Sequence, residues 1–288
     1  MNWPNNSPFA VWLTHDVDRV KKAWFHVLYY FLQQRRGYHL ISKLRKKEPY
    51  WNFDVVMNIE GKHKVKSTFF FLNESLRCSF LKPQEWKLAF GRYDINDEKI
   101  KEVIRKLNRE GWEIGLHGSY YSYINKDLLF QEKKGLENIL MKKINGVRQH
   151  YLNISIPMTW KLQHEVGFRY DASFGYTRTI GFREEKYHPF FPLGNEFMVI
   201  PLAIMDTALF EESRDPDKAW AKCLEIIELA EEKGALLSIL WHNRVFDEKE
   251  FPGYALTYEK IIIECKNRNA WFGTGEGFLN QFAGTPHR

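Results

Sequence analysis

The stretch FAVWLTHDVD at residues 9–18 decides the fold and locates the chemistry. Residues 9–14 are apolar and rich in aromatic and β-branched side chains, a pattern typical of a buried strand. His15, Asp16 and Asp18 stand at the end of this strand. In parallel α/β proteins the ligand site lies at the carboxyl ends of the strands. The stretch therefore predicts a strand that delivers acidic and imidazole groups to a site.

Apolar runs alternate with amphipathic stretches along the rest of the chain. We expect strands at residues 65–72, 112–117, 147–152, 168–173, 198–202, 235–241 and 270–272. We expect helices at residues 94–111, 126–144, 158–166, 215–233 and 256–265. The run ALLSILW at 235–241 is almost wholly apolar, as in a strand of a sheet covered on both faces. The alternation predicts an α/β fold with parallel strands, and residues 1–288 as a single domain.

The composition indicates a globular protein and leaves its partner open. The 288 residues are 44% hydrophobic and 27% charged, which excludes a disordered chain and a collagen. Three scattered cysteines are too few for a disulfide framework or a cysteine zinc site. No secretory signal or apolar run of membrane-spanning length is visible, so we expect a cytoplasmic protein. The net charge of +6 indicates an acidic partner.

The positive charge is concentrated in one segment after the first strand. Residues 19–47 contain no carboxylate and nine basic side chains, with aromatic residues between them. We interpret the segment as a helical insertion at residues 19–60. It is either a solvated helical face or a surface that docks on an anionic bilayer or on the diphosphate of a lipid-linked glycan. The sequence contains no nucleic-acid-reading motif, so we expect no nucleic acid as a partner.

Polar residues follow several other predicted strands in the same way. The residues are His117, Arg148, His150, Asp171, Asp206, His242 and Asn243. Each alone has an ordinary structural role as a helix cap, an ion pair or a core histidine, and for Asp206 a cap and a site residue are equally favoured. Together they supply the carboxylates and imidazoles that bind a divalent metal and move protons. The set favours a metal-assisted hydrolase.

These motifs also resemble those of a known family. The ordered set LTHDVD, KVKSTFFFL, GWEIGLHG, VRQHY and LSILWH is similar to the motifs of the polysaccharide deacetylase superfamily (carbohydrate esterase family 4), over about residues 9–243. The resemblance implies a distorted (β/α)7 barrel. It also implies a metal-dependent hydrolase that removes an N- or O-acetyl group from a sugar.

The resemblance also implies a role for each matching residue. Asp16 corresponds to the catalytic base and Arg148 to the arginine that orients it. Asp18 and His117 correspond to metal ligands. His242 corresponds to the general acid that protonates the leaving group.

Further positions are implied to contact the substrate. Tyr151 falls where the family supplies a backbone N–H to the oxyanion. Asp171 matches a residue that orders the family's active site. Arg183, in a loop that resembles a substrate-facing one, and Asn243, next to His242, are the other predicted substrate contacts.

The sequence departs from the family at one metal ligand. The family has a second histidine four residues after the first, and here that position is Tyr121. His150 is our candidate substitute, because it lies two residues after Arg148 and so on the same face of the predicted strand. The alternatives are that His150 contacts the substrate or one of the residues that bind the metal, or that the metal site is weak or absent. The metal expected is zinc, with nickel, cobalt or manganese as alternatives.

The sequence thus predicts a deacetylase whose substrate is a carbohydrate. The expected substrate is a surface polysaccharide or its lipid-linked precursor, such as an O-antigen or capsule intermediate. The expected location is the cytoplasm, with peripheral contact at the inner membrane face through residues 19–47. The alternative is a catalytically degenerate barrel that binds glycans.

Overall fold

The computed structural model describes residues 3–24, 48–74, 92–213 and 215–282, and a few positions between 27 and 41. Within them, nine strands form one sheet in the order β6-β5-β4-β3-β2-β1-β8-β7, with β9 beside β1. They are β1 (Ala10–Val17), β2 (Thr68–Leu72), β3 (Glu113–Gly118), β4 (Gly146–Gln149), β5 (Tyr170–Asp171), β6 (Met198–Val199), β7 (Ile204–Met205), β8 (Leu236–Leu240) and β9 (Trp271–Gly273). All these strand pairs are parallel, which confirms the predicted α/β class.

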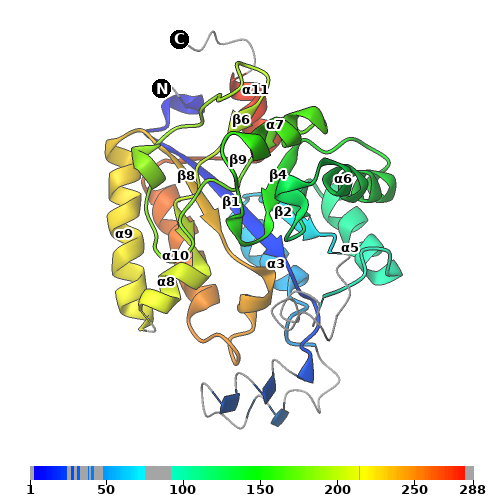
Figure 1. Cartoon of the computed structure of the whole chain (residues 1–288). Helices are drawn as coiled ribbons and strands as arrows, with labels where there is room; N and C mark the ends of the chain where they lie inside the picture. Colours follow the sequence, from blue (N-terminus) through cyan, green and yellow to red (C-terminus); the bar gives the residue numbers. More distant parts are fainter. Residues whose placement is uncertain are drawn as a thin grey trace.

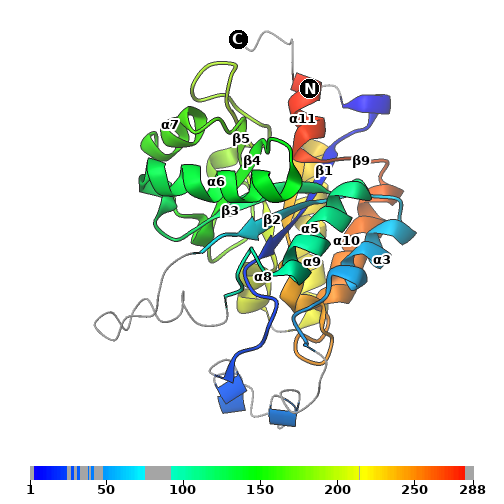
Figure 2. The same cartoon turned by 90° about the vertical axis from the view of Figure 1, so that its right-hand side faces the viewer.

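Helices surround the outer face of this sheet (Figure 1 and Figure 2). They are α3 (Phe53–Lys62), α5 (Glu98–Arg109), α6 (Lys126–Leu140), α7 (Met158–Glu165), α8 (Asp206–Glu212), α9 (Pro216–Glu232) and α10 (Tyr254–Asn267), with α11 (Gly275–Phe282) at one end. The predicted signals set their ends. Asp215 caps α9 by accepting from the Asp217 N–H, and Gly234 follows the helix at φ 58°.

Several predicted strands are shorter in the structure. The strand expected at 147–152 ends at Gln149, because His150–Leu152 form a 3-10 turn in which Tyr151 has φ 58°. The strands expected at 168–173 and 198–202 shrink to two residues each. The strand expected at 198–202 stops early because Pro201 has no N–H to continue the hydrogen-bond ladder.

The sheet curls round until its two edge strands approach each other. β6 and β7 are the ends of the strand order, yet only residues 200–203 connect them. This connection bonds to both flanks, since Leu202 N donates to Phe174 O at 2.8 Å and Ala203 N to Ser238 O at 3.0 Å. The result is the distorted barrel that the resemblance implied.

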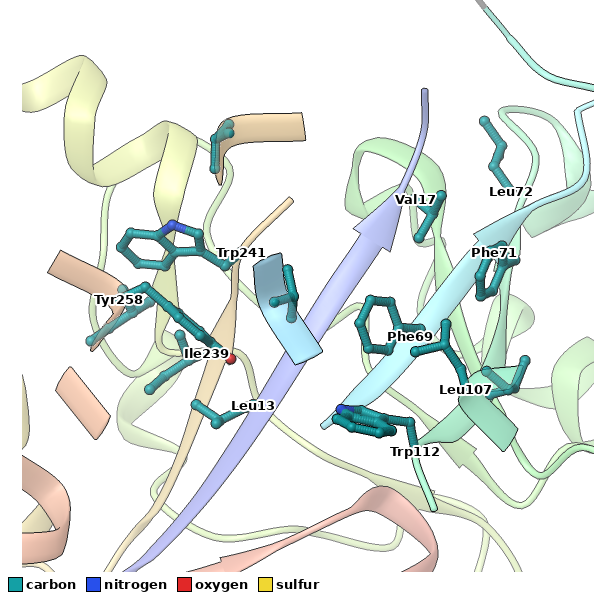
Figure 3. Packing of buried hydrophobic residues seen from close by; sticks show 14 of the residues in the cluster. Leu13, Val17, Phe69, Phe71, Leu72, Leu107, Trp112, Ile239, Trp241 and Tyr258 are labelled. Atoms are coloured by element: carbon teal, nitrogen blue, oxygen red, sulfur yellow. The ribbon is translucent and has the colours of Figure 1, made fainter. Parts of the chain in front are cut away.

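Side-chain alternation along β1 separates the two faces of the sheet. Val11 and Leu13 point outward into the core shared with the helices, the layer that Figure 3 shows around Leu13. Ala10 and Trp12 point inward with a second buried cluster. Because the period is two residues, Thr14 and Asp16 also face the interior of the barrel.

The amino-terminal end of the barrel is closed by apolar side chains. Phe278 and Phe282 of α11 pack there with Trp12, whose ring lies 6.3 Å from that of Phe278. The polar interior positions are therefore left at the carboxyl end of the strands. That is the end at which the predicted site residues stand.

The predicted insertion at 19–60 falls partly outside the described residues. Its last part is α3, which packs on the sheet through Phe53 and Val56. At its beginning, Lys22 is buried and its Nζ donates to both oxygens of Glu250 at 2.5 and 2.6 Å. Lys22 therefore anchors the segment instead of contributing to a basic surface. None of the helices in the described part of the chain has the length and apolar character needed to cross a membrane.

Candidate active site

The carboxyl ends of four strands bring five predicted side chains into one cluster. Asp18, just after β1, is at its centre. Its carboxylate oxygens lie 3.1 Å from His117 Nε2, 3.9 Å from His150 Nε2 and 3.5 Å from His242 Nε2. Asp16 completes the group, 3.7 Å from His117 Nε2. Residues that lie between positions 16 and 242 of the sequence are thus within a few ångströms of one another in the fold.

Asp16 is held by the buried Arg148. Arg148 Nη1 donates to Asp16 Oδ1 at 3.0 Å and to Thr14 Oγ1 at 2.8 Å, and its Nε donates to the carbonyl of Ala172 at 2.9 Å. Asp16 Oδ2 is the oxygen that faces His117. One oxygen of Asp16 is therefore fixed by the guanidinium, while the other is turned toward the cluster as a proton acceptor.

Asp18, His117 and His150 form a group that can hold a cation. One ligand atom from each lies within 4.8 Å of the others. His117 Nδ1 lies 2.9 Å from the carbonyl of Arg148, which assigns the proton to Nδ1 and leaves the Nε2 lone pair facing Asp18.

The unpaired atoms of this group test whether it suits a metal. Among the described residues, buried Asp18 Oδ1 and His150 Nδ1 find no hydrogen-bond partner. A buried carboxylate oxygen that faces two imidazoles and lacks a donor costs free energy unless a cation occupies the space. Carboxylate and imidazole are suitable ligands for zinc and related divalent ions, so these residues fit such an ion.

The cluster is electrostatically arranged for a cation as well. Burial opposes the charge of Asp18, but His242, His117, His150 and Arg244 outweigh it and hold its pKa well below the ordinary value. Burial also opposes charge on His117, yet Asp16 and Asp18 raise its pKa. Burial lowers the pKa of His150 to about 3, so its ring is neutral near neutral pH. The carboxylates thus create a negative potential at the position where the imidazole nitrogens meet.

His242 is oriented by Asp206, the buried first residue of α8. The two Asp206 oxygens contact His242 Nδ1 and the His242 backbone N–H, each at 2.7 Å. Thr207 N also donates to Asp206 Oδ1. Asp206, for which the sequence favoured a helix cap and a site residue equally, is the first residue of α8 but not its cap, since Met205 stands at that position, and its carboxylate contacts His242 instead. Since His242 Nδ1–H donates to Asp206 Oδ1, His242 presents Nε2 to the cluster.

Tyr151 stands beside the cluster in a left-handed turn. Its φ of 58° and the φ of 54° at Leu152 are uncommon for residues with a side chain. Its ring is half exposed and lies 4.5 Å from the ring of His150. The sharp turn ends β4 and brings the Tyr151 backbone next to His150. The 3-10 turn also corrects one expectation, because His150 is not on the strand with Arg148.

The other predicted substrate residues have contacts away from Asp18. Arg183 stacks on the ring of Phe174 at 4.5 Å. Asp171 is buried and accepts from Gln163 and from Ser173, which orders the end of β5. Their contact with substrate stays a prediction.

Asn243 and Tyr121 are also placed by local contacts. Buried Asn243 donates to the carbonyl of Tyr50 at 3.1 Å. Tyr121 stands at the start of the 3-10 turn Ser122–Ile124, with its ring 5.0 Å from that of Tyr120. The clustered ligand atoms belong to Asp18, His117 and His150. These residues stand just after β1, on β3 and in the turn after β4.

Arg244 is the site residue that sequence reasoning missed. It lies in the 3-10 turn Asn243–Phe246 after β8, and its Nη1 donates to Asp18 Oδ2 at 2.8 Å. The only sequence signal was its place two residues after His242. Its direction toward Asp18 depends on the turn, which residue types do not reveal.

The comparisons with known proteins agree with this architecture. No protein-family model matches the chain, and no curated protein does. Solved structures do match. A protein from Pseudomonas aeruginosa PAO1, named as a polysaccharide deacetylase, has 16% identity and a TM-score of 0.67, over 99% of this chain and 95% of its own. One from Mycobacterium smegmatis, also named as a polysaccharide deacetylase, has 17% identity and a TM-score of 0.65, over 100% and 96%.

A third match carries a different name on the same fold. It is a CE4 family pseudoenzyme from Bacillus anthracis, with 13% identity and a TM-score of 0.52, over 96% of this chain and 66% of its own. Likeness at this level of identity establishes architecture, while activity depends on the site. This chain has the fold of the polysaccharide deacetylases.

Proposed function

We propose that the protein is a metal-dependent hydrolase that removes an acetyl group, N- or O-linked, from a sugar. The observation that carries the proposal is the Asp18, His117 and His150 cluster, with its ligand atoms within 4.8 Å. His117 of this cluster lies 3.7 Å from Asp16, the partner of Arg148, and Asp18 lies 3.5 Å from His242, the partner of Asp206. A divalent ion held there, with zinc the first expectation, would polarise the acetyl carbonyl and acidify a water.

The protein's own residues supply the proton transfers. Asp16 Oδ2, turned toward the cluster, accepts the proton of the attacking water, while Arg148 fixes Oδ1. His242 Nε2 donates to the leaving amine or alkoxide, and Asp206 stabilises the imidazolium that carries this proton. The backbone N–H of Tyr151, in its left-handed turn, is our candidate donor to the oxyanion.

A metal and acetate measurement tests this function. Purified protein should contain about one divalent ion per chain and release acetate from acetylated glycans. Asp16→Asn should retain the ion and lose acetate release. If no divalent ion binds and acetate release does not depend on Asp16, the proposal fails.

The alternative is a degenerate barrel that binds glycans without cleaving them. Tyr121, at the position of the family's second histidine, and the pseudoenzyme with the same fold favour it. Glycan binding without acetate release would support this alternative, and measurable turnover would exclude it.

We also propose that residues 19–47 contact an anionic membrane surface in the cytoplasm and bring the site to a lipid-linked glycan. Trp24, Leu28 and Leu32 are 60%, 55% and 65% exposed at a spacing of four residues. The described pieces of this segment project from the barrel near the end of β1 (Figure 1). Exposed apolar groups among basic residues suit an anionic interface.

Vesicle sedimentation tests the membrane contact. The Lys43, Arg45, Lys46 and Lys47 to Gln variant should lose binding to anionic vesicles while the barrel stays folded. Binding that is unchanged, or equal on neutral vesicles, would refute this role.

A further inference from the structure

The two oxygens of Asp18 have different surroundings. Oδ1 faces His117 and His150, and among the described residues it finds no hydrogen-bond donor. Oδ2 accepts from Arg244 Nη1 at 2.8 Å and lies 3.5 Å from His242 Nε2. One oxygen is thus open to a cation while a fixed charge already holds the other.

We propose that Arg244 is a positioning residue that fixes Asp18 as a one-oxygen metal ligand. This inference rests on the proposed function. The short contact from Nη1 keeps Oδ2 turned away from His117 and His150 and so points Oδ1 toward them. Partners behind a metal ligand commonly fix its orientation in this way.

The location of Arg244 favours such a role. Its side chain is 13% exposed, the same fraction as that of Asp18, so water screens the contact weakly. It comes from the turn after β8, whereas Asp18 follows β1, His117 lies on β3 and His150 follows β4. Arg244 therefore ties the strand that carries His242 to the group that would hold the ion.

A guanidinium near a divalent ion has two opposing effects. Its positive charge repels the ion, which by itself would make binding tighter once the arginine is removed. Its hydrogen bond fixes the ligand, which would make binding weaker once the arginine is removed. Because Oδ1 is the Asp18 oxygen that faces both His117 and His150, and the Arg244 contact holds it in that direction, we infer that the positioning effect is the larger.

Arg244 also differs from a lysine at this place. A guanidinium is charged at all relevant pH values and has donors in a fixed planar fork, so it directs a carboxylate oxygen better than a flexible ammonium does. Arg244→Lys should keep the charge and restore part of the positioning. Arg244→Met should lose both.

Calorimetric titration of metal-free protein with Zn²⁺ tests the proposal without reference to activity. We expect Arg244→Met to raise the Kd about 10- to 100-fold, and Arg244→Lys to recover part of that loss. The visible absorption of bound Co²⁺ should also change in Arg244→Met, because a second Asp18 oxygen becomes available. Arg268→Met is the matched control. Arg268 caps the end of α10 and pairs with Glu264 and Glu231, which are not residues of the proposed site.

The outcomes separate this inference from the proposed function. If the wild type binds Zn²⁺ and Arg244→Met binds it with equal or higher affinity, the inference is overturned and the proposed function stands. Wild type that binds no divalent ion overturns both. If Arg244→Met does not fold, Arg244→Gln takes its place, with the same expected weakening and unchanged affinity again contradicting the proposal.

Discussion

Two buried clusters of imidazole and carboxylate groups lie on opposite faces of β1. On the outer face, His15 contacts the carbonyl of Trp241 at 2.7 Å and Glu60 Oε1 at 2.8 Å. Glu60 Oε2 accepts from Ser67 at 2.9 Å and from the indole of Trp112 at 2.5 Å. Every ring nitrogen and carboxylate oxygen of this outer cluster has a partner, so the cluster is structural.

The inner cluster is built from the same residue types but is left incomplete. Within the described part of the chain, Asp18 Oδ1, His150 Nδ1 and Arg148 Nη2 are buried without a hydrogen bond. His15 of the outer cluster and Asp16 of the inner one are adjacent in the sequence, so the local sequence does not separate the two clusters. Between these two clusters, which match in burial and residue type, the unfilled hydrogen-bonding capacity of the inner one is the difference.

Removing one carboxylate from each cluster should give the largest contrast in activity. Asp16→Asn should lower kcat for acetate release about 10²- to 10⁴-fold, because the water loses its proton acceptor. Glu60→Gln should leave kcat per folded molecule unchanged. Single-turnover acetate release, corrected for the folded fraction, measures both. Equal losses in the two variants would remove the distinction between the clusters.

Metal binding should separate the clusters in the same way. His150→Ala removes a proposed ligand and should weaken Zn²⁺ binding at least about 100-fold, the upper end of what is lost when only a supporting residue is changed. His15→Ala should bind Zn²⁺ as wild type does. Calorimetric titration of the metal-free proteins measures both affinities. Wild-type affinity in His150→Ala would point to a different third ligand.

The free energy of unfolding should depend more on the outer cluster than on the inner one. Glu60→Gln leaves a mismatched group among His15, Trp112 and the Tyr258 hydroxyl, which donates to Glu60 at 2.7 Å. A buried polar group without a proper partner costs about 1–3 kcal/mol of the free energy of unfolding. Urea unfolding of the metal-free protein should show this loss. A change below the error of the measurement would mean that the outer network contributes little.

The period of two in β1 made much of the inner cluster predictable from the sequence. Alternation along FAVWLTHDVD places Asp16 on the face of Trp12 and His15 on the face of Leu13. The α/β class and the capped helices followed from local signals in the same way. What alternation does not contain is the geometry beyond a strand's end, where the chain turns.

The turns explain the residues that were missed or misplaced. His150 approaches Asp18 from a 3-10 turn and not from the strand, and Arg244 approaches it from another. Asp206 meets His242 only because residues 200–203 carry the chain across the closing gap of the barrel. Lys22 counted as one of nine basic residues, yet it pairs with Glu250, 228 positions away. Such long-range pairings depend on the assembled fold.

The pH dependence of stability bears on the inner cluster alone. In metal-free protein, burial lowers the pKa of His150 from 6.5 to about 3. As the pH falls from about 6.5 toward 3, the unfolded chain takes up a proton at His150 before the folded protein does, so the folded state is progressively destabilised. His150→Gln lacks this proton uptake. As the pH falls from 7 to 5, the stability of His150→Gln relative to wild type should therefore rise steadily. Urea unfolding with a chelator present measures this difference. Parallel curves for the two proteins would mean that His150 is solvated in the metal-free state, and that the inner cluster is open to water even before an ion binds.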